Sequence, residues 1–203
     1  MLAIVLSRRD FRENDQIISF YTLEQGKLEV LARGVKKFLS KNAAFLEPFC
    51  FVDAEIIKGK ELTHLGSAQP INIFKNIRAD LQKSLAAGYA VALIDKIIHT
   101  GEKDKRMFEL IKSWLEWLDS SALFNAMMLN AFIAKLLTLL GFDPSAHESN
   151  LEIKNILEKL VFGSWQSIAE IKYNADEANN IQKELYNFAI KHLERKIGNW
   201  IFA

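Results

Sequence analysis

The sequence contains a single cysteine, Cys50, in 203 residues. One cysteine excludes a disulfide framework and a cysteine-rich zinc site within one chain. Cys50 belongs to a short apolar run, residues 49–52, which predicts a small buried residue and not a nucleophile. The four histidines are far apart in the sequence: His64, His99, His147 and His192. They show no metal-ligand spacing, so we expect no zinc, no other metal and no cofactor.

Long hydrophobic runs are also missing. No stretch of about 18 uninterrupted apolar residues is present, so we expect no membrane-spanning helix. The apolar run at residues 2–6 is too short for a signal peptide, and its charges follow the run instead of preceding it. These features predict a cytoplasmic protein with no membrane partner.

Neither sign of charge dominates, because 26 basic residues face 25 acidic ones. Net charge therefore predicts no partner, and affinity for nucleic acid must come from local clustering. Half of the residues are apolar and a quarter are charged, a composition typical of folded globular proteins.

The common catalytic motifs are absent as well. The sequence has no GxxxxGK[ST], no GxGxxG after a strand, no HExxH and no GxSxG. Carboxylates such as Glu13 and Asp15 lie in a charged segment, where exposure gives no reason for the raised pKa that an acid catalyst needs. We therefore expect a protein that is not an enzyme, while a catalytic site assembled only by folding stays open as an alternative.

The first third of the chain has the pattern of short strands. Apolar runs rich in β-branched and aromatic residues alternate with turn signals at residues 24–27 and 58–60. The predicted strands are residues 2–8, 16–22, 28–33, 49–57 and 61–71. Five strands in about 75 residues are too few for a sandwich of usual size, but they can close into an OB-fold barrel.

From about residue 75 the apolar period becomes helical. Asp80 is a candidate cap for a helix that Gly101 ends. Further helices are predicted at residues 107–118, 122–140, 151–162 and 176–197. The sequence thus predicts an α+β chain with two parts: a five-stranded OB-fold barrel at residues 1–76 and an all-α domain at residues 77–203. No proline- or glycine-rich linker separates them.

The most informative segment is residues 33–41, which follows the third predicted strand. It carries four cations, and no acid occurs from residue 30 to residue 46. The cations, Arg33, Lys36, Lys37 and Lys41, are candidates for neutralising DNA phosphates. Phe38 is a candidate for stacking on an unpaired base, and Ser40 for donating to a phosphate.

A second basic cluster follows the first predicted strand. It contains Arg8, Arg9 and Arg12, but acids at positions 10, 13 and 15 dilute it. The alternative to DNA binding is a solvated surface, with Phe38 pinning the loop to the barrel. The pattern alone leaves both interpretations open.

Several short elements, in order and spacing, resemble the bacterial RecO family. They are E-N-D at residues 13–15, F-x-T-x-x-x-G at 20–26, A-R-G-V-K-K at 32–37, L-x-P-F at 46–49, and the helix-ending L-L-G-F-D-P at 139–144. Each element is weak alone, and their combination is specific. The resemblance covers residues 1–144 well and the last 60 residues loosely.

The resemblance implies an OB-fold DNA-binding domain followed by a helical domain. It implies a non-catalytic, nucleoid-associated recombination mediator that acts in repair of DNA damage, binds single- and double-stranded DNA and anneals complementary strands. RecR and the C-terminal tail of single-stranded-DNA-binding protein (SSB) would be its partners in loading RecA. Arg33, Lys36, Lys37 and Ser40 would contact the DNA backbone. Arg8, Arg9 and Arg12 would add supporting charge.

Two departures from the family pattern stand out. Many members carry a four-cysteine zinc module after the central helix, and here residues 144–149 contain no cysteine. A basic pair associated with the SSB tail aligns with Asn130 and Ala131, so Lys135, one turn later, is the candidate replacement. The competing interpretation is a generic OB-fold module that recognises RNA or a protein.

Overall fold

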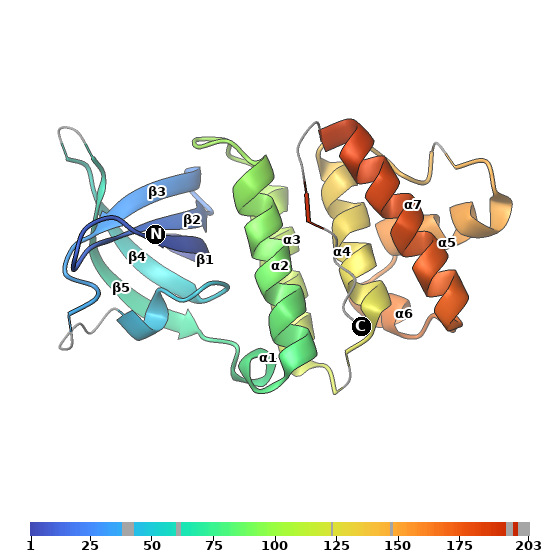
Figure 1. Cartoon of the computed structure of the whole chain (residues 1–203), viewed down its shortest axis with the longest axis horizontal. Helices are drawn as coiled ribbons and strands as arrows, with labels where there is room; N and C mark the ends of the chain where they lie inside the picture. The colour runs from blue at the N-terminus through green and yellow to red at the C-terminus, as the bar shows by residue number, and fades with distance from the viewer. Residues whose placement is uncertain (38–42, 60–61, 123, 147, 194–196, 199–203) are drawn as a thin grey trace. The chain divides into compact units, whose positions relative to one another are not determined.

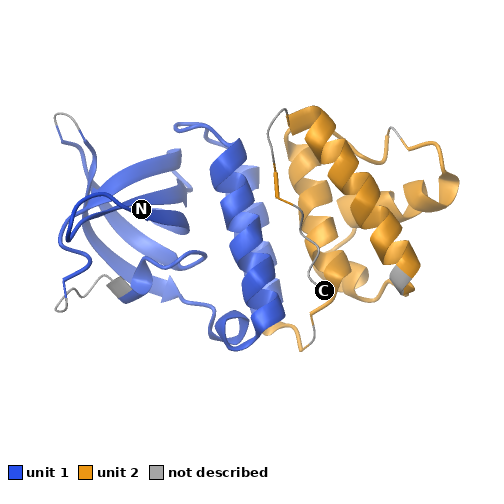
Figure 2. Ribbon diagram, in the orientation of Figure 1, with its two compact units in different colours: residues 1–119 blue, residues 120–203 orange. Residues whose placement is uncertain are grey.

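The computed structural model describes residues 1–37, 43–59, 62–122, 124–146, 148–193 and 197–198. The chain forms two compact units, residues 1–119 and residues 120–203 (Figure 2). The first unit holds five strands and then helices, and the second is helical. In the described part of the chain no strand follows Asn72. The fold class predicted from the sequence is confirmed.

The five strands are β1 (Leu2–Asp10), β2 (Gln16–Thr22), β3 (Gly26–Ala32), β4 (Phe51–Ile57) and β5 (His64–Asn72). They close into a barrel in the order β1-β2-β3-β5-β4 (Figure 1). β3 and β5 pair in parallel, with Leu31 opposite His64, and the other neighbouring pairs are antiparallel. This arrangement confirms the predicted OB-fold barrel.

The predicted limits of β2 are confirmed at both ends, and those of the other strands differ from the structure by at most three residues. β4 begins at Phe51 and not at residue 49, because Phe49 has a φ of 56° and cannot continue an extended strand. β3 ends at Ala32, two residues before Gly34, which has a φ of 63°. A short 3₁₀ helix, Ala43–Phe45, was not predicted.

Strand β1 is buried on both faces. Ala3 and Val5 belong to the barrel interior, while the alternate residues Ile4 and Leu6 are also fully buried. The reason is that helix α2 (Leu81–Ile97) packs against β1. A strand covered on both faces has a continuous apolar sequence, which explains why residues 2–6 show no alternation.

Two more helices complete the first unit, α1 (Lys75–Ala79) and α3 (Lys105–Ser120). The predicted cap of α2 is confirmed, because the Asp80 carboxylate accepts from the Lys83 backbone N–H at 3.0 Å. Helix α1 was not predicted. Its first N–H groups donate to the Asp119 carboxylate, at 2.9 Å from Asn76 and 3.0 Å from Ile77, a partner that is distant in sequence.

A buried polar cluster joins the barrel to α2. The Asp95 carboxylate accepts from the hydroxyls of Ser7 and Ser19, both at 2.6 Å, and pairs with the Lys27 ammonium at 3.1 Å. Lys27 also donates to the carbonyls of Asp95 and Ile98. Burial raises the pKa of Asp95, but the hydrogen bonds from Ser19, Ser7 and Lys27 outweigh it and leave that pKa below its usual value. We call Ser7, Ser19, Lys27 and Asp95 the helix-anchoring cluster.

The turn between β2 and β3 binds the segment between α2 and α3. Lys27 N–H donates to the Glu102 carbonyl at 3.3 Å, and Gly101 N–H donates to the Lys27 carbonyl at 2.8 Å. Gly26 has a φ of 69°, and a Cβ there would lie 1.9 Å from the Glu102 carbonyl oxygen. Glycine is therefore required for this contact.

The second unit contains α4 (Ala126–Leu139), α5 (Leu151–Phe162), α6 (Trp165–Ala169) and α7 (Ala175–Leu193). Helix α4 is its core and packs against each of the other three, which confirms the predicted central helix. It begins at residue 126 because the Asn125 side chain caps it by accepting from Met127 N–H at 2.7 Å. Helix α6 was not predicted, and residues 194–196 of the last predicted helix lie outside the described residues.

The first compact unit ends at Asp119, so α2 and α3 belong to the same unit as the barrel. The change from strands to helices occurs earlier, between Asn72 and Lys75. The boundary predicted at 76/77 follows this change of secondary structure, and as a domain boundary it stays a prediction.

Candidate nucleic-acid interface

The described residues of both basic clusters lie at one end of the β1-β2-β3 meander. In the strand register, Asp10 is opposite Gln16 and Gln16 is opposite Ala32. The turn that follows β1 and the segment that follows β3 therefore leave the sheet at the same end. The other turn of the meander, next to Gly26, lies at the opposite end. We call residues 8–15 and 33–37 together the basic rim.

Hydrogen bonds connect the two parts of the basic rim. The Asp15 carboxylate accepts from Gly34 N–H at 2.8 Å, and the Asn14 carbonyl accepts from Lys36 N–H at 3.1 Å. Lys37 N–H donates to the Gly34 carbonyl at 3.1 Å, which closes a turn around the buried Val35. The E-N-D and A-R-G-V-K-K elements are thus two halves of one structure, and this connection was not predicted from the sequence.

Half of the basic rim's cations are paired with acids. Arg8 binds Glu47 at 2.7 Å, Arg9 binds Glu29 at 3.3 Å, and Lys36 binds Asp10 at 2.8 Å. Hydrogen bonds from Gln16 and then Lys36 hold the pKa of Asp10 below its usual value. All three pairs are exposed, so they contribute little to stability and salt screens them.

The other three described cations of the rim are Arg12, Arg33 and Lys37. They are exposed, and none forms an ion pair with another described residue. Three further predicted contacts, Phe38, Ser40 and Lys41, lie outside the described residues. A rim that offers unpaired cations next to loosely paired ones has the chemistry to bind a polyanion, because phosphates can replace exposed carboxylates as partners.

The structure also shows an aromatic residue that the sequence analysis missed. Phe11 lies in the turn after β1, its residue surface is 40% exposed, and the Arg12 guanidinium carbon is 5.1 Å from its ring centroid. The sequence contained the signal, because Phe11 lies between Arg9 and Arg12 in a segment rich in charge. The hairpin register was needed to place its turn at the same end of the sheet as residues 33–37.

Comparison with known proteins identifies the family. Residues 1–74 match the family described as Recombination protein O N terminal, and residues 78–199 match Recombination protein O C terminal. The chain belongs to the RecO family. It is 35% identical over 140 residues to the DNA repair protein RecO of Geobacter metallireducens, and 36% identical over 143 residues to that of Desulforamulus reducens.

These matches cover 69% and 70% of the chain, but only 57% and 55% of the two RecO relatives. The DNA repair protein RecO of Clostridium perfringens matches over 165 residues at 28% identity, covering 79% of the chain. The match to the family confirms the resemblance found in the sequence. It also agrees with the division of the chain into strands before residue 74 and helices after it.

Lys135, the candidate for the RecO partner site, lies on α4 in the second unit. Its ammonium donates to the carbonyls of Val161 and Gly163, both at 2.7 Å, and lies 5.3 Å from the Trp165 ring centroid. Burial lowers the pKa of Lys135. The side chain therefore stabilises the C-terminal end of α5, where free carbonyls favour a cation. A role in partner binding stays a prediction.

Among the described residues no group of three or more His, Cys, Asp or Glu side chains could hold a metal ion. Cys50 is fully buried, burial raises the pKa of its thiol, and Arg78 donates to its sulfur at 3.1 Å. This confirms Cys50 as a buried structural residue. Within the same residues, no helix combines the length and apolar character needed to cross a membrane.

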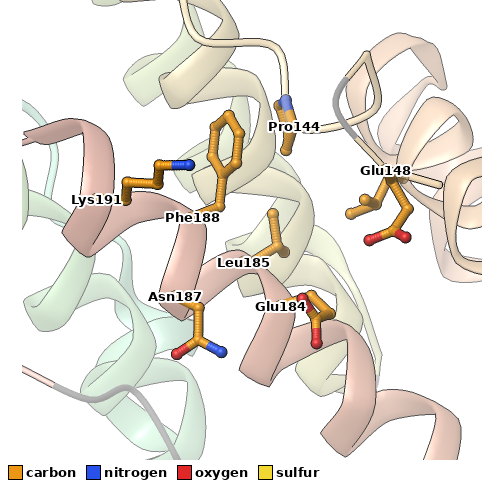
Figure 3. A pocket seen from close by; sticks show the side chains of 8 residues that line it. Pro144, Glu148, Glu184, Leu185, Asn187, Phe188 and Lys191 are labelled. Atoms are coloured by element: carbon orange, nitrogen blue, oxygen red, sulfur yellow. The ribbon is translucent and has the colours of Figure 1, made fainter. Parts of the chain in front are cut away.

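The second unit contains a pocket of about 210 Å³ between α5, α7 and the segment that follows α4 (Figure 3). Helix α7 contributes Leu185, Phe188 and Lys191 at helical spacing, and Glu184 and Glu148 lie on the side away from Lys191. The side chains that line the pocket do not pair a nucleophile with a base, so we assign no catalytic role to it.

Proposed function

We propose that this RecO-family chain is a non-catalytic DNA repair and recombination mediator, and that its basic rim binds the phosphate backbone of single- and double-stranded DNA. One observation carries the proposal: hydrogen bonds between Asp15 and Gly34 and between Asn14 and Lys36 join two basic segments at one barrel end. The joined segments present Arg12, Arg33 and Lys37 without acid partners among the described residues.

The rim's chemistry suits a sequence-independent ligand. Its cations are exposed, and four of them, Arg12, Arg33, Lys36 and Lys37, lie outside the strands, so they can reach phosphates without entering a groove. Contacts to phosphates fix position but read no base sequence. Such binding is the property that strand annealing requires, because an annealing protein must accept strands of any sequence.

Family membership extends the proposal to partners. We infer that the chain anneals complementary strands, acts with RecR, and helps to load RecA onto DNA covered by SSB, in the cytoplasm at the nucleoid. The SSB tail is proposed to bind the helical part of the chain, with Lys135 as the candidate contact. Since Lys135 already donates to two carbonyls, a tail carboxylate would have to compete with them or bind beside them.

The test of DNA binding is a salt-titrated series on single-stranded DNA. Each neutralised phosphate contributes about 0.7 to the slope of log affinity against log salt. Replacing Arg33 and Lys37 together by Ala should lower this slope by about 1 to 1.5. Lys36→Ala should lower it less, because Lys36 is already paired with Asp10.

The matched control is a Lys103→Ala, Lys105→Ala double variant, which removes the same charge. Lys103 and Lys105 are exposed, and they adjoin the segment bound to the opposite end of the β1-β2-β3 meander. If the two double variants bind DNA alike, the basic rim is only a solvated surface. A preference for RNA over DNA of the same sequence would instead favour an RNA-binding OB-fold module.

A further inference from the structure

The turn after β1 exposes a large aromatic ring. Phe11 is 40% exposed, whereas Phe20 of the neighbouring strand is fully buried. The turn is held by its own backbone, with Phe11 N–H donating to the Asp15 carbonyl at 3.1 Å and Asp15 N–H donating to the Arg12 carbonyl at 3.4 Å. The ring is not part of the barrel core, so its surface is available to a ligand.

The groups around Phe11 are those that bind a nucleic-acid backbone. The Arg12 guanidinium carbon lies 5.1 Å from the ring centroid. The adjacent Asp10 holds the Lys36 ammonium at 2.8 Å. Through Asp15 the turn also positions Gly34 in the segment that carries Arg33 and Lys37. The exposed ring thus has the Arg12 guanidinium against it, and it lies in the turn that is hydrogen-bonded to the segment carrying Arg33 and Lys37.

We propose that Phe11 and the Arg12 guanidinium form a stacking platform for an unpaired DNA base. The inference rests on the proposed function, and it adds the feature that would distinguish single-stranded from duplex DNA. Aromatic rings and guanidinium planes both stack on bases, and stacking tolerates any base because every base has a π face. A base in a duplex is already stacked on its neighbours and is not free to bind the ring.

The test is a set of Phe11 variants with three ligands of equal charge. They are oligodeoxythymidylate, a strand of the same length built from abasic sugar-phosphate, and a blunt duplex with the same number of phosphates. Phe11→Ala should weaken oligodeoxythymidylate binding about 5- to 150-fold, the range expected for loss of one stacked base. Affinity for the abasic strand and the duplex should stay within about twofold, and the salt slope should not change.

Conservative variants separate stacking from general hydrophobic contact. Phe11→Tyr keeps an aromatic ring and should bind like the wild type, whereas Phe11→Leu should behave like Phe11→Ala. If Phe11→Leu binds oligodeoxythymidylate as tightly as the wild type does, the stacking proposal is wrong. Thermal melting of each variant checks that it is folded. If Phe11→Ala is destabilised, the comparison of Phe11→Tyr with Phe11→Leu still tests stacking.

Phe162→Ala is the matched control, since Phe162 is 71% exposed at the last residue of α5 and is not part of the rim. It should leave all three affinities unchanged. If the Arg33, Lys37 double variant loses affinity while Phe11→Ala does not, stacking is wrong and the proposed function stands. If neither variant differs from its control, the rim does not bind DNA and both proposals fail.

Discussion

The helix-anchoring cluster and the basic rim are made from the same residue types in different surroundings. In the cluster, the side chains of Lys27 and Asp95 are 11% and 23% exposed, and both have further hydrogen-bond partners. In the rim, the side chains of Lys36 and Asp10 are 37% and 64% exposed. A largely buried ion pair with further hydrogen-bond partners holds two elements together, whereas an exposed pair can exchange partners.

This difference assigns separate roles to motifs that lie close together in the sequence. The F-x-T-x-x-x-G element and Lys27 build the barrel and anchor α2 and its following segment. The E-N-D and A-R-G-V-K-K elements build a surface. We therefore expect changes in the cluster to affect stability and changes in the rim to affect DNA affinity. The following predictions test this separation.

The largest effect is expected for Lys27→Met. Met preserves the apolar stem but leaves the Asp95 carboxylate and the Ile98 carbonyl without their cation. Losing one partner of a buried pair should lower the free energy of unfolding by about 3 kcal/mol, at the low end of the usual range because Asp95 retains Ser7 and Ser19. Urea unfolding followed by circular dichroism measures this change.

Lys36→Met is the control for Lys27→Met, because it breaks an ion pair of the same type on the surface. We expect no measurable loss of stability from it. The salt slope of DNA binding by folded Lys27→Met should equal that of the wild type. Equal destabilisation by the two substitutions would contradict the distinction between cluster and rim.

Two glycines with positive φ offer a second comparison. Gly26→Ala places a methyl group 1.9 Å from the Glu102 carbonyl oxygen, so the segment between α2 and α3 must move. Gly34→Ala meets only the Lys37 side chain, at 3.5 Å. The left-handed conformation alone costs a non-glycine residue about 1 to 2 kcal/mol.

We therefore expect a loss of about 1 kcal/mol for Gly34→Ala and about 2 to 3 kcal/mol for Gly26→Ala, measured by the same unfolding experiment. The Gly34 N–H remains available to Asp15 in the Ala variant, so DNA binding should be retained. If Gly34→Ala is the more destabilising substitution, the rim is a more important part of the fold than we infer.

Much of the fold could be predicted because its signals are local. Strand-length runs, turn residues and the Asp80 cap depend on neighbours in the sequence. Helix α1 was missed because its N–H groups bind Asp119, some 40 residues later, and α6 was missed because a five-residue helix leaves almost no periodic pattern. The continuous burial of β1 also depends on α2, which the sequence of the strand does not reveal.

The site was predictable only as two separate basic clusters. Charge counts along the chain identified all six cations of the rim but could not separate the three that pair with acids from Arg12, Arg33 and Lys37. The partners Glu29 and Glu47 reach Arg9 and Arg8 only through folding. Phe11 was overlooked for the same reason. Its turn follows β1, whereas the segment hydrogen-bonded to that turn, residues 33–37, follows β3.

The smallest effect, and the one most specific to the rim, is expected for Asp10→Asn. The substitution releases Lys36 from its ion pair, while the Asn side-chain oxygen can still accept from Gln16. Single-stranded DNA should then bind more tightly at low salt, with a slope that increases by up to about 0.7, because one more cation is free to bind phosphate. Most rim substitutions should weaken DNA binding, so an increase in affinity would be a stringent test of this assignment.

Asp53→Asn provides the control, because Asp53 is an equally exposed carboxylate of the barrel that pairs with the N-terminal amine. Both variants change the net charge by the same amount, so an equal gain would reflect only the long-range field of the protein. A gain for Asp10→Asn alone would place Lys36 at the phosphate backbone. An unchanged or weaker affinity would mean that Lys36 does not face DNA, and the interface would then have to be confined to Arg12, Arg33 and Lys37.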